Sequence, residues 1–225
     1  MKSYMIAFIP AAMLAVAVIT YINKGDGNTV DEHNQSPFVQ VDNVQGNNIQ
    51  NKKEACCKVE KSGEYSDSSI YNFTNCWKDE NGDLVTLKKF EGKKIILAMI
   101  YTSCPTACPV IVSNMQKLES AIPPNELGNY HFVLVSIDPD RDSPQQLKKF
   151  ASERNLNHNT WTLLTGSKNA VAELAELIGF NYKKNPDGNF THSNLITFLD
   201  KDGIIMNQCE GLDQSKEKLL AMLNK

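Results

Sequence analysis

The alternation of short apolar runs with helix-patterned segments is the strongest constraint on how this chain can fold. Residues 94–101 (KIILAMIY) and 131–137 (HFVLVSI) are continuous apolar runs of strand length, which is typical of strands buried on both faces. Between them, residues 109–122 carry apolar side chains at helical spacing, and Pro123-Pro124 ends that pattern. Strands that alternate with helices predict an α/β domain whose central sheet is partly parallel.

The rest of the globular pattern supports the same fold class. We expect one helix to begin at Ser143-Pro144 and another at Ser167, because each serine is a good N-cap. Hairpins are predicted around Asn81-Gly82-Asp83 and around residues 200–203. The other predicted elements are strands at 70–73, 84–87, 161–164, 194–199 and 204–206 and a closing helix at 214–223.

The first residues predict where the domain works. Residues 4–22 form a stretch of 19 residues without a charge, which is long enough to span a bilayer as a helix. The alternative is a secretory signal peptide cleaved at the small residues Ala15-Val16-Ala17. Apolar residues continue past that site to Ile22, which favours an uncleaved anchor. Both alternatives place the rest of the chain outside the cytoplasm, in the cell envelope.

Composition divides the chain further. Residues 24–65 are polar, and such a segment cannot bury enough surface to offset the entropy lost on ordering. We therefore predict a membrane anchor or signal peptide at 1–23, a flexible polar tether at 24–65 and one globular domain at 66–225. The net charge of −3 and the lack of a long basic run argue against a nucleic-acid partner.

Cys104 and Cys108 are the residues with the clearest chemistry. They follow the predicted strand at 94–101 and open the next helix, where sites form in α/β sheets. Backbone N–H groups at a helix start favour negative charge, so they lower the pKa of a thiol. Spacing alone favours a redox pair, with a soft-metal pair close behind. A structural disulfide, half of a zinc site and two unreactive core thiols are the other readings, and no second ligand pair for zinc is evident.

Other polar residues carry weaker signals. His192 lies just before the strand pattern at 194–199. This position alone only modestly favours a functional role over that of a structural or exposed histidine. We expect Asp138, Asp140 and Asp142 to form turns and caps, with Asp138 also a candidate for orienting the site. Residues expected to be structural, exposed or core are His33, His131, His158, Met99, Met115 and Met206.

Three motifs in this order resemble the Sco (SenC) family of copper-binding proteins. They are residues 96–118 (ILAMIYTSCPTACPVIVSNMQKL), residues 133–144 (VLVSIDPDRDSP), and Thr191-His192-Ser193 with the hairpin that follows. The resemblance covers about residues 66–225. It implies a three-layer thioredoxin-like fold with an added N-terminal β-hairpin. It also implies copper ligands at Cys104, Cys108 and His192.

The same resemblance implies a role in assembling the copper centre of a haem-copper cytochrome oxidase. Members are proposed to deliver copper to the copper-acceptor subunit, to reduce its cysteines, or both. Other copper chaperones and thiol reductants are therefore further expected partners. This sequence departs from the family between the cysteines, where Thr106-Ala107 replaces the commoner Asp-Val. The missing negative charge bears on copper affinity and on redox potential.

The competing hypothesis is an enzyme, an extracytoplasmic thiol–disulfide oxidoreductase in which Cys104 and Cys108 react without an obligatory metal. Thioredoxin-type enzymes carry Cys-x-x-Cys and a proline before the facing strand. Here the spacing is one residue longer and Thr191-His192-Ser193 has no such proline, so both differences favour metal. Cys56-Cys57 in the tether is a candidate resolving or copper-passing pair. The alternative is that these cysteines form structural disulfides, for example with Cys76 or Cys209.

Overall fold

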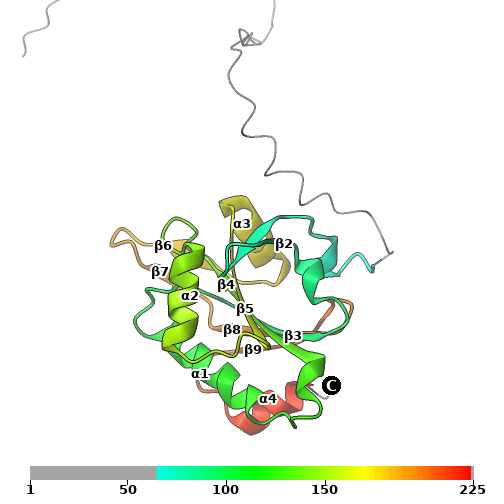
Figure 1. Cartoon of the computed structure of the whole chain (residues 1–225). Helices are drawn as coiled ribbons and strands as arrows, with labels where there is room; N and C mark the ends of the chain where they lie inside the picture. Colours follow the sequence, from blue (N-terminus) through cyan, green and yellow to red (C-terminus); the bar gives the residue numbers. More distant parts are fainter. Residues whose placement is uncertain (1–64, 224–225) are drawn as a thin grey trace, which may run out of the picture. The chain divides into compact units, whose positions relative to one another are not determined.

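The computed structural model describes residues 65–223, which contain the predicted globular domain (Figure 1). The predicted anchor, the tether up to residue 64, Cys56-Cys57 and His33 lie outside the described residues. Within residues 65–223, no helix combines the length and the apolar character that crossing a membrane requires.

A seven-stranded sheet forms the centre of the domain, in the order β2-β1-β5-β4-β3-β8-β9 (Figure 1). The central strands β5, β4 and β3 are parallel, and the strands on both sides pair antiparallel, which confirms the partly parallel sheet. These strands are β1 (Trp77–Asp79), β2 (Leu84–Val85), β3 (Lys94–Ile100), β4 (Tyr130–Ser136), β5 (Trp161–Gly166), β8 (Leu195–Leu199) and β9 (Ile205–Glu210).

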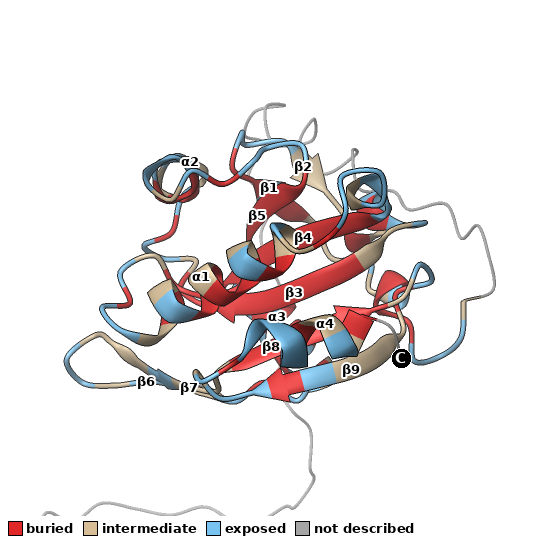
Figure 2. Ribbon diagram, turned by 90° about the horizontal axis from the view of Figure 1, so that it is seen from below, coloured by how far each residue is buried: buried red, intermediate tan, exposed pale blue. Residues whose placement is uncertain are grey.

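Helices cover both faces of this sheet. In the described residues they are α1 (Ala107–Glu119), α2 (Pro144–Glu153), α3 (Lys168–Leu177) and α4 (Lys216–Leu223). The path from β3 through β4 to β5 crosses the sheet in one direction, so right-handed connections place α1 and α2 on the same face. Figure 1 shows α4 beside α1 on one side of the sheet and α3 on the other, which gives three layers, and Figure 2 shows the face that carries α1 and α4.

Coverage on both faces explains the continuous apolar run of β3. From Ile95 to Ile100 no side chain is more than 1 % exposed. Fully burying one such side chain contributes roughly 1.5–3 kcal/mol, so a strand of this kind is stable only inside a layered domain. Its carboxyl end is therefore held in a fixed position, and the cysteine loop begins there.

The helix starts follow the predicted capping. Ser143 Oγ accepts a hydrogen bond from the Gln146 N–H at 3.2 Å, and Ser167 Oγ accepts one from the Ala170 N–H at 3.1 Å. Helix α1 begins at Ala107, two residues before the predicted start, so Cys108 lies in its first turn.

The predicted first hairpin is correct in its turn and wrong in its first strand. Residues 70–73 fall on a 3-10 helix, η3 (Ile70–Asn72), and the strand that pairs with β2 is β1. Local capping explains the difference, because Ser69 Oγ accepts a hydrogen bond from the Tyr71 N–H. The Ile70 N–H also donates to the Gly203 carbonyl at 3.0 Å, so this segment packs on the β8–β9 turn.

A second short hairpin was not predicted. Strands β6 (Tyr182–Lys184) and β7 (Phe190–His192) pair in a separate two-stranded sheet, in a segment where the sequence predicted no strand. The strands are short, partly exposed and rich in polar residues, so they lack the alternation by which a half-buried strand is recognised. This hairpin carries His192.

His131 is a buried structural histidine. Its ring stacks on Phe90 with ring centroids 5.0 Å apart, and its Nε2 lies 2.9 Å from Thr162 Oγ1. Among the described residues, its Nδ1 has no hydrogen-bond partner. Burial, together with the nearby Lys93 and Lys89, lowers the pKa of His131 to about 4.

This pKa predicts a specific loss of stability in acid. The folded pKa of about 4 lies below the unfolded value of 6.5, so stability is full above pH 6.5 and falls as the pH drops toward 4. The loss from this one group is about 3 kcal/mol between pH 7 and pH 4. Urea unfolding of His131→Gln should show a shallower decline than wild type by about that amount. His158→Gln is the control, and an equal decline in His131→Gln and wild type would contradict the prediction.

Candidate metal centre

The two cysteines are held at the carboxyl end of β3. After β3 the chain turns, with the Cys104 N–H donating to the Tyr101 carbonyl at 3.2 Å, and it enters α1 at Ala107. The Cys108 N–H then donates to Cys104 Sγ at 3.3 Å. A free N–H at the helix start is thereby satisfied by sulfur, and this favours a thiolate at Cys104.

His192 reaches the same point from the end of β7. Its Nε2 lies 3.9 Å from Cys104 Sγ and 3.8 Å from Cys108 Sγ. The three ligand atoms all lie within 4.8 Å of one another. The structure therefore brings together the three residues singled out from the sequence.

The imidazole is oriented by its surroundings. Its Nδ1 lies 2.8 Å from the Ser193 carbonyl, which can only accept, so Nδ1 donates and carries the proton. Nε2 faces the two sulfurs, so it can donate a hydrogen bond to Cys104 Sγ when it carries a proton and can bind a metal when it does not. The ring stacks on Phe180 and meets Tyr101 edge-on, with centroids 6.0 Å and 5.8 Å away.

The two thiols differ in acidity. Burial raises the pKa of Cys104, but hydrogen bonds from the Cys108 N–H, His192 and the Thr106 N–H outweigh it and lower that pKa to about 6. Burial raises the pKa of Cys108 well above its usual range. Near neutral pH, Cys104 is therefore a thiolate beside a Cys108 thiol. The thiolate is the form that attacks disulfides and binds metals.

The donor set fits a soft monovalent metal. Two sulfurs and one neutral imidazole nitrogen are ligands that suit copper. Zinc usually takes four ligands, and in the part of the chain that is described no fourth His, Cys, Asp or Glu joins this group. Met99 and Met115 are fully buried core residues, as predicted.

Asp142 has a larger role than the predicted turn. Its side chain is fully buried and accepts hydrogen bonds from Thr102 N–H at 3.0 Å, Thr102 Oγ1 at 2.6 Å and Ser136 Oγ at 2.6 Å. It therefore fixes the start of the cysteine loop. The sequence signal that was missed is that Ser143 already caps α2, which leaves Asp142 free for another role.

Asp138 and Asp140 differ from each other as well. Asp138 is 1 % exposed and pairs with Arg141 and with Lys184 of β6, so the prediction that it orients the site has structural support. Asp140 is exposed and pairs with Lys168 at 2.8 Å.

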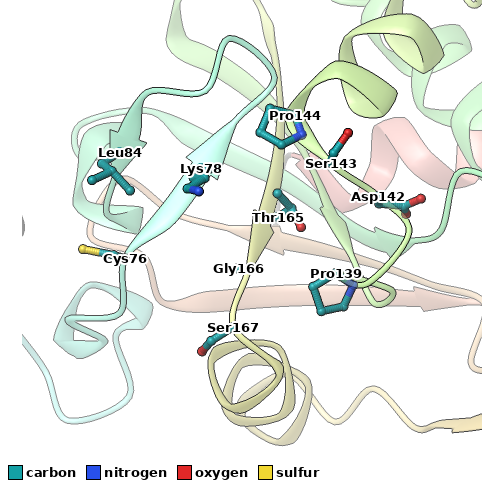
Figure 3. Close-up of a pocket in the computed structure, with 10 residues that line it drawn as sticks. All are labelled: Cys76, Lys78, Leu84, Pro139, Asp142, Ser143, Pro144, Thr165, Gly166 and Ser167. Atoms are coloured by element: carbon teal, nitrogen blue, oxygen red, sulfur yellow. The ribbon is translucent and has the colours of Figure 1, made fainter. Parts of the chain in front are cut away.

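A pocket of about 400 Å³ lies beside the loop between β4 and α2, bordered by Pro139 and Pro144 (Figure 3). The three candidate ligands do not line it.

The remaining cysteines of the described part lie outside the group. The free thiols are Cys104, Cys108 and Cys209, and Cys76 is disulfide-bonded. Cys209 on β9 is buried and donates to Gln214 Oε1 at 2.6 Å, a structural role.

Comparison with known proteins agrees with this site. A thioredoxin-like α/β domain with a Cys-x-x-x-Cys loop facing a histidine defines a class of thiol- and metal-handling proteins. The SCO1/SenC family model matches residues 68–225 of the chain. The chain therefore belongs to the SCO1/SenC family.

Individual relatives have low sequence identity to this chain, but the alignments cover most of its length. The SCO1 protein homolog of Bacillus subtilis is 27% identical over 142 residues, which cover 62% of this chain and 73% of that protein. The copper-bound structure of Bradyrhizobium japonicum ScoI is 25% identical with a TM-score of 0.57, over 67% of this chain and 95% of that one.

Two further structures are similar to this chain. A SCO1/SenC family lipoprotein of Bacillus anthracis is 26% identical with a TM-score of 0.61, over 66% of this chain and 90% of that one. BsSco, described as a member of the Sco family of cytochrome c oxidase assembly proteins, is 25% identical with a TM-score of 0.57, over 66% of this chain and 88% of that one. The predicted thioredoxin-like fold is confirmed.

The pKa difference between the thiols is measurable in the reduced, metal-free domain. We expect the ultraviolet absorbance of thiolate to rise with a midpoint near pH 6, because Cys104 ionises first. The midpoint should disappear in Cys104→Ala and move to higher pH in His192→Ala, which loses one stabilising hydrogen bond. Cys209→Ala is the control that keeps the midpoint. A single transition near the ordinary cysteine pKa of about 8.5 would contradict the expectation.

Proposed function

We propose that this protein binds one copper ion through Cys104, Cys108 and His192 and passes it to the copper centre of a haem-copper cytochrome oxidase. The observation that carries the proposal is the convergence of two sulfurs and an imidazole nitrogen within 4.8 Å. Membership of the SCO1/SenC family and the copper-bound ScoI structure support copper as the ion. The description of BsSco supports an oxidase acceptor.

Location follows from the N-terminal sequence. We propose that residues 1–23 anchor the chain or export it, and that residues 24–65 hold the domain away from the membrane. The lipoprotein relative supports a membrane-associated site outside the cytoplasm. Copper centres of an oxidase accessible from that side would then be within reach of the tethered domain.

The chain's own residues supply three things to the cargo ion. Cys104 supplies a thiolate at neutral pH, Cys108 supplies a second one after losing its proton, and His192 supplies Nε2, which already faces both sulfurs. His192 is partly exposed, Cys104 is 7 % exposed and Cys108 is fully buried, so ligands of a partner reach His192 and Cys104 before Cys108. The order of exposure therefore sets the order of ligand exchange.

A second candidate function is reduction of a disulfide in the acceptor, and the lowered pKa of Cys104 specifically favours it. The Cys104 thiolate would attack one sulfur of the acceptor disulfide and release the other as a thiolate. Cys108, after giving up its proton, would then attack Cys104 Sγ. The acceptor ends with two reduced cysteines and this chain with a Cys104–Cys108 disulfide.

Copper binding by the reduced domain tests the first function. Titration with Cu(I) against a competing chelator should give about one ion per domain in wild type. Cys104→Ala, Cys108→Ala and His192→Ala should each weaken binding by more than about 100-fold, because each removes one of only three ligands, a larger loss than removing an outer-shell partner. Cys209→Ala is the matched control, since it removes a buried thiol outside the group. Undiminished affinity in His192→Ala would sink the proposal.

The oxidised domain tests how the two functions are linked. Forming the Cys104–Cys108 disulfide removes both thiolate ligands, so the oxidised domain should bind copper far more weakly than the reduced one. The comparison uses the same chelator competition before and after mild oxidation, with Cys209→Ala as the control that removes the third free thiol of the described residues and keeps both ligand sulfurs. Equal affinity of the two forms would show that the sulfurs are not the ligands.

A further inference from the structure

The hairpin β6–β7, which carries His192, has no ladder of hydrogen bonds to the main sheet. It forms its own two-stranded sheet, and a two-stranded hairpin by itself is marginally stable in water. The position of the imidazole therefore depends on side-chain contacts between this hairpin and the body of the domain.

Arg141 contacts both the turn of the hairpin and a buried carboxylate in the body of the domain. Its guanidinium donates through Nη2 to the Gly188 carbonyl at 2.7 Å, in the turn of the hairpin, and through Nε to the buried Asp138 carboxylate. The same carboxylate lies 3.7 Å from Lys184 Nζ on β6. Because Asp138 is 1 % exposed, its charge must be paired, so the carboxylate holds Arg141 in place.

Aromatic packing supplies another part of the attachment, because the Phe190 ring lies 5.2 Å from the Tyr101 ring, centroid to centroid. It leaves a gap beside the polar contacts. A pocket of about 260 Å³ lies between the loop after β4, helix α3 and the hairpin, lined among others by Asp138, Val171, Lys184 and Phe190. The hairpin is thus bound on this side by Arg141 and Lys184 across a partly open space. The guanidinium also lies over the Tyr101 ring, which itself meets the His192 ring edge-on.

The loop after β4 also contacts the cysteine loop, which follows β3. Asp142 follows Arg141 directly and binds the backbone and hydroxyl of Thr102, at the start of the cysteine loop. Adjacent residues of one loop therefore contact the two halves of the metal site. Arg141 contacts the imidazole half and Asp142 contacts the thiol half.

We infer that Arg141 and Asp142 are positioning residues that set the spacing between His192 and the two sulfurs. This inference rests on the proposed function, because the spacing matters only if one copper ion is bound by Cys104, Cys108 and His192 together. Arg141 acts mainly through the hairpin that carries His192, and Asp142 acts through the cysteine loop. Lysine cannot replace Arg141, since one ammonium cannot make both contacts of the forked guanidinium.

A double-mutant cycle on Cu(I) affinity tests the inference. Arg141→Ala should weaken binding by about tenfold, the scale of outer-shell partners of metal ligands, and Arg141→Lys should not restore it. In the His192→Ala background, Arg141→Ala should have little further effect, because its main route to the metal, through the hairpin, is gone. Asp142→Asn should keep its effect in that background. Arg154→Ala, which removes the other arginine and its contact with Phe150, is the control.

Backbone amide exchange supplies a readout that needs no metal. In Arg141→Ala and Arg141→Lys, exchange should speed up in residues 182–193 and stay unchanged in β3 and β4. Wild-type Cu(I) affinity in Arg141→Ala, an equal loss in both backgrounds, or unchanged exchange in the hairpin would each overturn the inference. If His192→Ala binds Cu(I) as well as wild type, the proposed function fails, and amide exchange alone decides the role of Arg141.

Discussion

The antiparallel pairing of β8 with β3 is the constraint on which the site depends. Ala98 lies opposite Ile196, so the chain runs forward from one to Cys104 and backward from the other to His192. Both paths end at the same edge of the sheet. A slip of one residue in this register would turn the buried side chains of β8 to the opposite face and move His192 along the edge. The convergence of imidazole and thiols is therefore a consequence of sheet register.

Parallel pairing brings a third segment to the same edge. β4 runs beside β3 with Ile100 opposite Ser136, so the loop after β4 lies next to the cysteine loop. Buried carboxylates on that loop need partners, and they find them in Thr102 on one side and Arg141 on the other. The polar network thus follows from burying Asp138 and Asp142 at a place where two strands end.

The opposite pKa shifts of the two thiols join the two candidate functions. A thiolate at Cys104 beside a protonated Cys108 is ready to attack a disulfide, and the same thiolate is ready to bind a soft ion. An ion that also takes Cys108 must displace a proton from a buried sulfur, so binding is linked to pH and to redox state. The difference in pKa between the two thiols has separate causes. The N–H groups of the helix start and the imidazole lower the pKa of Cys104, and burial raises that of Cys108.

The amino-acid sequence by itself determined the α/β class, the buried strands, the serine caps of α2 and α3, and the identity of the three candidate ligands. These follow from apolar periodicity, capping chemistry and motifs that lie within short segments. Only the tertiary structure decided that residues 70–72 form a 3-10 helix and that a hairpin carries His192. It alone also showed that Arg141 and Asp142 connect the imidazole and thiol halves of the metal site. For Arg141 and Asp142 the physical reason is range, because their hydrogen bonds join residues 47 and 40 positions apart. The 3-10 helix and the hairpin depend on nearer contacts, such as Ser69 with Tyr71 and Tyr182 with His192, which apolar periodicity does not record.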